Sequence, residues 1–180
     1  YCTWNCDEIN YIWRYGNRDY PYDNLPIKLL TDEKKYYVRK KFYQLLQKNK
    51  NAKVIVEKTC ANSLRVDYVH EIMPKSRFIY IKRDPIDVVA SSIKRWKAKL
   101  EPFYIAKKSI HIPREDVFFY AKEYLINRIK RNLSKDKTLP SWGPRFPTID
   151  EIRRNNCSII DLCVYQWFYC NHYAQKSLSK

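Results

Sequence analysis

Two basic residues, Lys58 and Arg83, each follow shortly after a run of apolar residues. Lys58 follows the run 54–56 after one glutamate, and Arg83 follows the run 78–81 after one lysine. Ser91 comes eight residues after Arg83. A guanidinium fork with a nearby hydroxyl suits phosphate oxygens, so the pattern predicts an anion site with phosphate as its ligand. The alternatives are that Arg83 pairs with a local carboxylate and that Lys58 is a solvated strand end.

The elements around these cations predict a βαβ unit. The runs 54–56 and 78–81 contain no polar residue, which is typical of strands buried on both faces of a parallel sheet. Apolar residues recur at helical spacing over 64–72. Asp84 can cap a helix whose first residue is Pro85. Because ligands bind outside the carboxyl ends of parallel strands, both cations are expected to face one crevice.

Three more helices are predicted. One begins after the N-cap Thr31, and the last begins at a capping box that opens with Ser158. Residues 97–113 are a candidate lid loop, and 134–147 form a second loop. At about 100 to 200 residues per domain, we expect residues 1–180 to form one domain. The helix between the two loops is expected to bury Val117, Ala121, Leu125 and Ile129.

The composition is that of a folded, strongly basic protein. There are 35 Lys and Arg against 19 Asp and Glu, a net charge of +16, but 45% of residues are hydrophobic and 16% aromatic, which excludes a disordered basic tail. Two glycines exclude a glycine-rich phosphate loop within the sequence. Six cysteines without a CxxC pair and three scattered histidines argue against structural zinc and favour free thiols over disulfides. No apolar stretch is long enough to span a membrane, and the compartment stays open.

Two segments resemble the nucleotide-binding motifs of a known enzyme family. Residues 83–92 resemble the 3′-phosphate motif of sulfotransferases that use 3′-phosphoadenosine 5′-phosphosulfate (PAPS), in which a strand-final Arg precedes a Ser by eight residues. Glu57-Lys58-Thr59, with Asn62 after it, looks like the strand end of the carbohydrate and protein-tyrosine branches. More loosely, 11–17 and 142–147 look like segments of a bacterial-type group.

The resemblance implies a fold, a reaction and a co-substrate. The fold is α/β, a three-layer P-loop-type domain with a central parallel sheet flanked by helices. The reaction is sulfuryl transfer from PAPS, without a metal, to a hydroxyl or amine acceptor, for which we expect a carbohydrate; nucleic acid is not an expected partner. By this resemblance Lys58 stabilises the leaving group, while Arg83 and Ser91 hold the 3′-phosphate.

The resemblance also suggests a base and a nucleotide contact. Glu8 is the expected base, because related branches place a Glu just ahead of an aromatic segment such as 11–13. Asp7 competes with it, and a surface carboxylate is the alternative for Glu8. Arg145 is expected to close over the nucleotide, with a structural turn as its alternative. Trp13, Trp96, Trp142 and Trp167 are expected to serve in packing more than as sugar platforms.

One family feature is missing. Sulfotransferases open with a 5′-phosphosulfate loop of the type Gly-x-Pro-Arg-Ser-Gly-Thr, and the sequence has none. We therefore expect these residues to be the middle of a longer protein, incomplete at both ends and inactive alone. Two other hypotheses remain: a non-catalytic basic protein that binds nucleic acid or polyanions, and a P-loop nucleotide kinase relative, which fits the two motifs less well.

Overall fold

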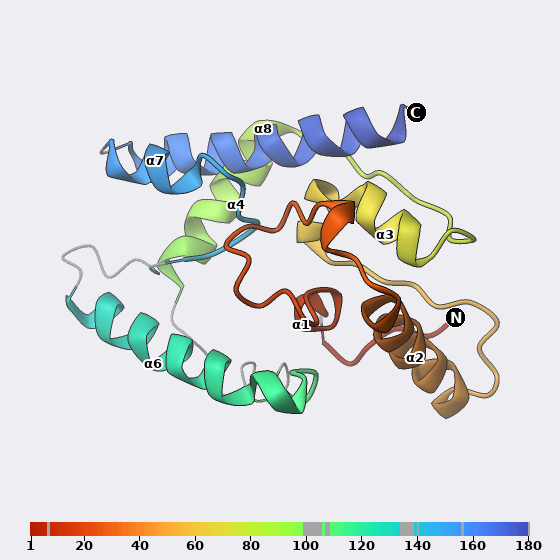
Figure 1. Ribbon diagram of the computed structural model, residues 1–180. Coiled ribbons are helices and arrows are strands. Elements are labelled where there is room, and N and C mark those ends of the chain that lie inside the picture. The colour runs from red at the N-terminus through yellow and green to blue at the C-terminus, as the bar shows by residue number, and fades with distance from the viewer. Residues whose placement is uncertain are drawn as a thin grey trace.

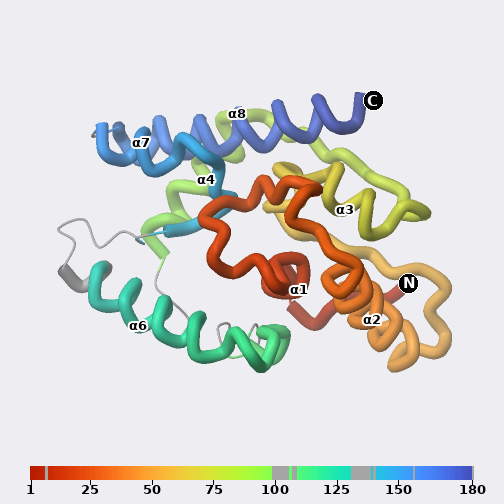
Figure 2. The backbone as a smooth tube through the Cα atoms, viewed as in Figure 1, coloured from red at the N-terminus to blue at the C-terminus, as the bar shows by residue number. Residues whose placement is uncertain are grey.

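The computed structural model describes residues 1–6, 8–98, 106, 109–133, 139, 141–155 and 157–179. In these residues helices alternate with long irregular segments (Figures 1 and 2). The predicted loops 97–113 and 134–147 lie partly outside the described residues. The α-helices are α1 (Asn10–Trp13), α2 (Asp32–Lys48), α3 (Val66–Ile72), α4 (Pro85–Lys97), α6 (Val117–Leu133), α7 (Ile149–Arg154) and α8 (Ile159–Leu178), and the 3₁₀ turns are η1 (Ile27–Leu29), η2 (Cys60–Leu64) and η3 (Arg114–Asp116).

The predicted helix starts are confirmed at three caps. The Thr31 hydroxyl accepts a hydrogen bond from the Lys34 N–H at the start of α2. Asp84 accepts from the Ile86 N–H at 2.8 Å, and α4 begins at Pro85. Ser158 opens α8 with the full capping box. Caps depend on neighbouring residues alone, so the sequence is sufficient to place them.

The expected central parallel sheet is wrong, because the described residues contain no sheet. Their only β-type pairing is an isolated parallel bridge between Cys2 and Ile55, in which the Cys2 N–H donates to the Val54 carbonyl and the Val56 N–H to the Cys2 carbonyl, each at 2.9 Å. The α/β, three-layer prediction is therefore replaced by a helical architecture in this part of the chain.

The second predicted strand shows why the sheet prediction failed. Apolar and β-branched residues favour an extended backbone, but a β-ladder also needs a neighbouring backbone to pair with. Within the described residues, 78–81 makes no backbone hydrogen bond to another segment. Only one side of the run is covered: Ile79 is 86% and Ile81 78% exposed, whereas Tyr80 is 38% exposed and its hydroxyl donates to Asn171 Oδ1 at 2.5 Å. The composition of the run was consistent with a buried strand, but burial depends on partners that composition does not reveal.

Helix α6 forms as predicted but with a different buried face. Leu125 is 58% and Ile129 60% exposed, so the predicted inward stripe faces outward, together with Phe118 at 87%. The helix docks at its N-terminal end, where Tyr120 meets Tyr11 edge-to-face with ring centroids 4.6 Å apart. In Figures 1 and 2, α6 lies at the lower left, with its N-terminal end towards α1 and its C-terminal end leading away. Periodicity located a helix here but could not tell which side of it meets the protein.

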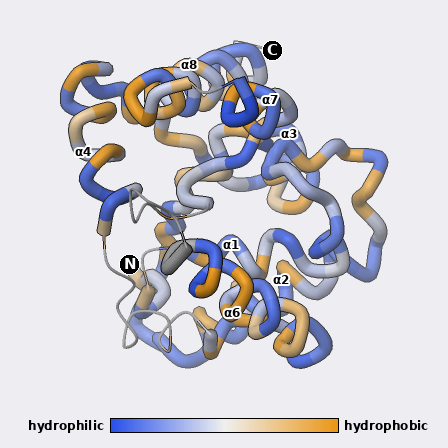
Figure 3. The backbone as a smooth tube through the Cα atoms, turned by 90° about the vertical axis from the view of Figure 1, so that its left-hand side faces the viewer, coloured by the Kyte–Doolittle hydropathy of each residue, from blue (hydrophilic) through white to orange (hydrophobic). Residues whose placement is uncertain are grey.

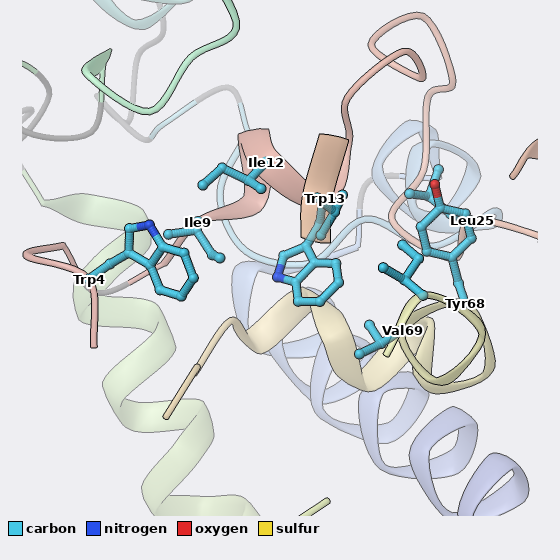
Figure 4. Close-up of a cluster of buried hydrophobic side chains, with 9 residues drawn as sticks. Trp4, Ile9, Ile12, Trp13, Leu25, Tyr68 and Val69 are labelled. Atoms are coloured by element: carbon cyan, nitrogen blue, oxygen red, sulfur yellow. The ribbon is translucent and has the colours of Figure 1, made fainter. Parts of the chain in front are cut away.

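Two hydrophobic clusters hold the structure together. Figure 4 shows the first, where α1 lies against α3 and Trp13 sits between Ile9 and Tyr68. The second joins α4 to α8 around Trp96, which is 1% exposed. Along α4 and α8, Figure 3 shows apolar orange stretches alternating with hydrophilic blue ones, as expected for helices that bury one side. Packing roles for Trp13 and Trp96 are therefore confirmed.

The described residues contain neither a membrane-spanning helix nor a disulfide. None of their helices is long and apolar enough to cross a membrane. No disulfide joins the six cysteines, all of which are described.

Candidate active site

Lys58 lies in a short extended segment between two inward-facing neighbours. Its own side chain is exposed, whereas Thr59 is buried and Glu57 is half-buried. The Thr59 hydroxyl donates to Glu57 Oε1 at 2.5 Å, so residues 57 and 59 are bonded to each other on the protein side of the chain. In extended backbone, alternate side chains point to opposite sides. The Lys58 amine is therefore presented to solvent.

Glu8 is joined to the turn that follows Lys58. Its Oε1 accepts a hydrogen bond from the Cys60 N–H at 3.2 Å, and the next residue, Ile9, donates its N–H to the Thr59 hydroxyl, also at 3.2 Å. These two bonds bring the N-terminal segment and the Lys58 turn together, although the two are some fifty residues apart in sequence. Asp7, the competing carboxylate, lies outside the described residues.

Arg83 and Ser91 lie in and just before α4, away in sequence from the turn that carries Lys58. Arg83 ends the exposed run that leads into α4, and Ser91 lies within α4; both side chains are exposed. Asp84, the nearest carboxylate in sequence, caps Ile86, and no ion pair among the described residues involves Arg83. Both groups are therefore open to a ligand. The described contacts do not join either of them to Lys58 or Glu8.

Arg145 serves as an anchor for the loop before α7. Its carbonyl accepts from the Asp23 N–H at 2.7 Å, and its own N–H donates to Asp23 Oδ2 at 2.9 Å. The guanidinium donates to both oxygens of Asp150, at 2.9 and 3.1 Å. A cavity of about 600 Å³ opens beside this pair, lined by Tyr22, Asp150, Arg153 and Arg154. To contact a nucleotide, Arg145 would have to exchange Asp150 for a phosphate.

A buried arginine that sequence analysis did not single out connects these segments. The side chain of Arg65 is 0% exposed. Its Nε donates to Asn62 Oδ1 at 2.9 Å and its Nη2 to Asn10 Oδ1 at 2.6 Å, while its Nη1 lies 3.7 Å from Asp23 Oδ1. Burial lowers the pKa of Arg65 to about 10, and the neighbouring Asp23 charge opposes that shift. At neutral pH the guanidinium is still protonated.

Asp23 is a shared acceptor and counter-charge for the polar groups around Arg65. Its Oδ1 accepts from Asn10 and from Arg14, each at 3.2 Å, and its Oδ2 accepts from the Arg145 N–H. One buried carboxylate thus faces two guanidiniums, those of Arg14 and Arg65. A run of hydrogen bonds consequently leads from the Lys58 turn, through Arg65, Asn10 and Asp23, to the Arg145 loop. No local pattern marks either Asp23 or Arg65, because their partners are distant in sequence.

Removing the Asp23 charge should destabilise the protein. Asp23→Asn removes the counter-charge that two buried guanidiniums share but retains one acceptor oxygen, so we expect the free energy of unfolding to fall by about 2 to 3 kcal/mol. Urea denaturation followed by circular dichroism measures the change. The control Asp19→Asn, at an exposed ion pair with Arg18, should shift it by less than about 0.5 kcal/mol. Equal effects of the two variants would contradict a structural role for the network.

Glu57, the residue before Lys58, is a carboxylate whose pKa is shifted by the fold. Burial raises its pKa, and hydrogen bonds from Thr59 and Asn62 act against that rise. The Asn62 side-chain amide donates to Glu57 Oε2 at 2.8 Å, so both carboxylate oxygens have a donor. Glu57 is thus held in place by the turn that carries Lys58.

The described residues include side-chain types that can bind anions. The part of the chain that the structure describes holds no group of three or more His, Cys, Asp or Glu side chains placed to bind a metal ion. What it offers instead is exposed cations, a hydroxyl on α4 and a carboxylate beside the Lys58 turn. A family model described as "Sulfotransferase family" matches residues 19–138, two thirds of the chain. No curated protein and no solved structure matches the chain at a significant level.

Proposed function

Because the chain belongs to the sulfotransferase family, we propose that it transfers a sulfuryl group from PAPS to a hydroxyl or amine of a carbohydrate. The observation that carries the proposal is the joining of Glu8 to the turn of Lys58 by the Cys60 N–H. Sulfuryl transfer needs a cation near the leaving oxygen and a base near the acceptor. The bond supports the proposal because it ties the proposed base to the turn that carries the proposed cation.

In this proposal, the residues at and before the start of α4 bind the nucleotide. Arg83 supplies a permanent positive charge with a planar fork, and Ser91 supplies a hydroxyl from the helix that follows. The dipole of α4 also favours an anion at its N-terminus, where Asp84 already accepts from the Ile86 N–H. These groups fit the 3′-phosphate of PAPS in chemical type.

In this proposal, Lys58 and Glu8 carry out the transfer of the sulfuryl group to the acceptor. The Lys58 amine stabilises the negative charge that builds on the bridging oxygen as the sulfuryl group leaves. Glu8 takes the proton from the acceptor hydroxyl. Arg145 approaches the nucleotide by exchanging the Asp150 carboxylate for a phosphate oxygen. An anionic carbohydrate suits the net charge of +16, because a basic surface steers anions.

The direct experiment follows radiolabelled sulfate from PAPS. The full-length protein is incubated with labelled PAPS and a panel of glycosaminoglycans, neutral oligosaccharides and a tyrosine peptide. Label on a carbohydrate supports the proposal, and label on the peptide alone would move the acceptor to another class. No transfer to any acceptor, together with no binding of adenosine 3′,5′-bisphosphate, would contradict the function.

A second candidate function is binding of polyanions without catalysis, which the charge of +16 favours. The two functions differ in how binding responds to salt and to one side chain. Polyanion binding weakens steeply with salt and depends on many cations. A mononucleotide site depends on few residues, so one substitution should remove most of its affinity.

Arg83→Ala should weaken binding of adenosine 3′,5′-bisphosphate by roughly 2 to 3 kcal/mol, which is the scale of a lost charge-assisted contact to phosphate. Titration calorimetry on the full-length protein would show this as a dissociation constant about 30 to 150 times higher. Arg77→Ala is the matched control, because Arg77 is also exposed and precedes the same apolar run. If the two variants bind equally well, Arg83 is not a phosphate ligand.

A further inference from the structure

We propose that Glu57 is the positioning residue for Lys58: its carboxylate fixes the conformation of residues 57–62 and thereby directs the Lys58 amine towards the proposed transfer site. The inference rests on the proposed function for the role of Lys58. It adds a residue that acts on the reaction without touching the substrate. Three features of the turn support it.

The first feature is the bond that spans Lys58. Glu57 Oε1 accepts from the Thr59 hydroxyl at 2.5 Å, and that hydroxyl in turn accepts from the buried Ile9 N–H at 3.2 Å. The residues on either side of Lys58 are therefore held to each other and to the N-terminal segment. Since neighbouring side chains in extended backbone diverge, this bond leaves the Lys58 amine only the outward side.

The second feature is the attachment of Glu57 to a rigid interior. Its Oε2 accepts from Asn62 at 2.8 Å, and the Asn62 oxygen accepts from Arg65 Nε at 2.9 Å. Arg65 has no exposed side-chain surface and bonds Asn10 through Nη2. The conformation of the turn is thus fixed by hydrogen bonds that lead to the Arg65 guanidinium, which cannot move without disturbing the interior.

The third feature is that the site needs a carboxylate. Both Thr59 and Asn62 donate to Glu57, so both of its side-chain oxygens must be acceptors. Glutamine has one acceptor oxygen and one donor amide, which would face the amide of Asn62. Burial of a charged group against these donors is consistent with a fixed role and not with a solvated surface side chain.

The test uses a single substitution and a paired one. In Glu57→Gln the new amide faces the Asn62 amide, so one bond is lost. The double variant combines Glu57→Gln with Asn62→Asp, so that the introduced glutamine amide can donate to the introduced carboxylate, which still accepts from Arg65.

We expect Glu57→Gln to lower kcat about 10-fold with the KM for PAPS within about twofold, because small displacements of a catalytic group reduce turnover. The double variant should return kcat to within about threefold of the unsubstituted protein. Glu71→Gln, at a partly exposed ion pair on α3, is the matched control and should change neither constant.

A cycle with Lys58 separates positioning from a direct role. If Glu57 acts through Lys58, Glu57→Gln should have no further effect on kcat in a Lys58→Ala background. An equal 10-fold loss in both backgrounds would show that Glu57 acts elsewhere and would overturn the proposal. A single variant that fails to fold would leave the double variant as the informative one, because its hydrogen bonds are complete.

A readout that needs no activity distinguishes this inference from the proposed function. The Ile9 amide donates to Thr59, so its hydrogen exchange reports whether the turn is held. We expect exchange at Ile9 to become about 10 times faster in Glu57→Gln and to be restored in the double variant. Unchanged exchange would overturn the role of Glu57 even if the protein transfers sulfate. Faster exchange in a protein that transfers no sulfate would instead reject the proposed function and the catalytic purpose of the turn together, while retaining its structural account.

Discussion

Glu8→Gln should lower kcat by about 10² to 10⁴ and leave PAPS binding intact, because the substitution removes a base and keeps its shape. Glutamine can still accept the hydrogen bond that the Cys60 N–H donates to Glu8 Oε1. The link between the N-terminal segment and the Lys58 turn is thereby preserved. Steady-state rates with the best carbohydrate acceptor, together with calorimetry for the nucleotide, measure the two effects separately.

The control for Glu8 is its neighbour in sequence. Asp7→Asn should change kcat little, although Asp7 lies outside the described residues. If the two effects are reversed, the base is Asp7 and the register of the N-terminal segment differs from the one inferred from its motif. If neither substitution lowers kcat, the proton is accepted by a group other than these two carboxylates.

Lys58→Ala should lower kcat by about 10² or more and change the dissociation constant of the nucleotide only a few-fold. A cation beside the leaving oxygen contributes most when negative charge develops there, which happens in the transition state and not in the bound ground state. Pre-steady-state rates at saturating PAPS test the chemical step directly.

Lys53→Ala is the matched control for Lys58. Lys53 is exposed and lies just ahead of the same apolar run, but it is outside the 57–62 turn. Its replacement removes an equal charge from the same region, so unequal effects would exclude a general contribution of the positive field. A loss of nucleotide affinity in Lys58→Ala with kcat unchanged would make Lys58 a ground-state anchor.

Local signals in the sequence predicted local structure well. Thr31, Asp84 and Ser158 each cap the helix predicted after them, because a cap is made by residues within one turn of chain. The family was likewise expected from two short motifs, one around Lys58 and one around Arg83, and both lie within the residues that the family model matches.

Signals that depend on distant partners predicted less. The run 78–81 has the composition of a buried strand, and the described residues leave Ile79 and Ile81 uncovered. The α6 stripe that includes Leu125 has helical periodicity but faces away from the protein. For the candidate site, sequence named the exposed cations but not Asp23 or Arg65, since a buried ionic network is defined by contacts across the chain.

The run 78–81, in which Ile79 and Ile81 are exposed, suggests a second role for Arg83. An exposed, β-prone apolar stretch is a template for strand-to-strand aggregation, and charged residues at its ends act as gatekeepers against it. Here Arg77 precedes the stretch and Lys82 and Arg83 follow it, so two copies brought edge to edge place like charges together. Salt screens that repulsion. The colloidal stability of the protein is therefore linked to the side chain proposed to hold the nucleotide, and a bound phosphate that neutralises Arg83 would weaken the gatekeeping as well.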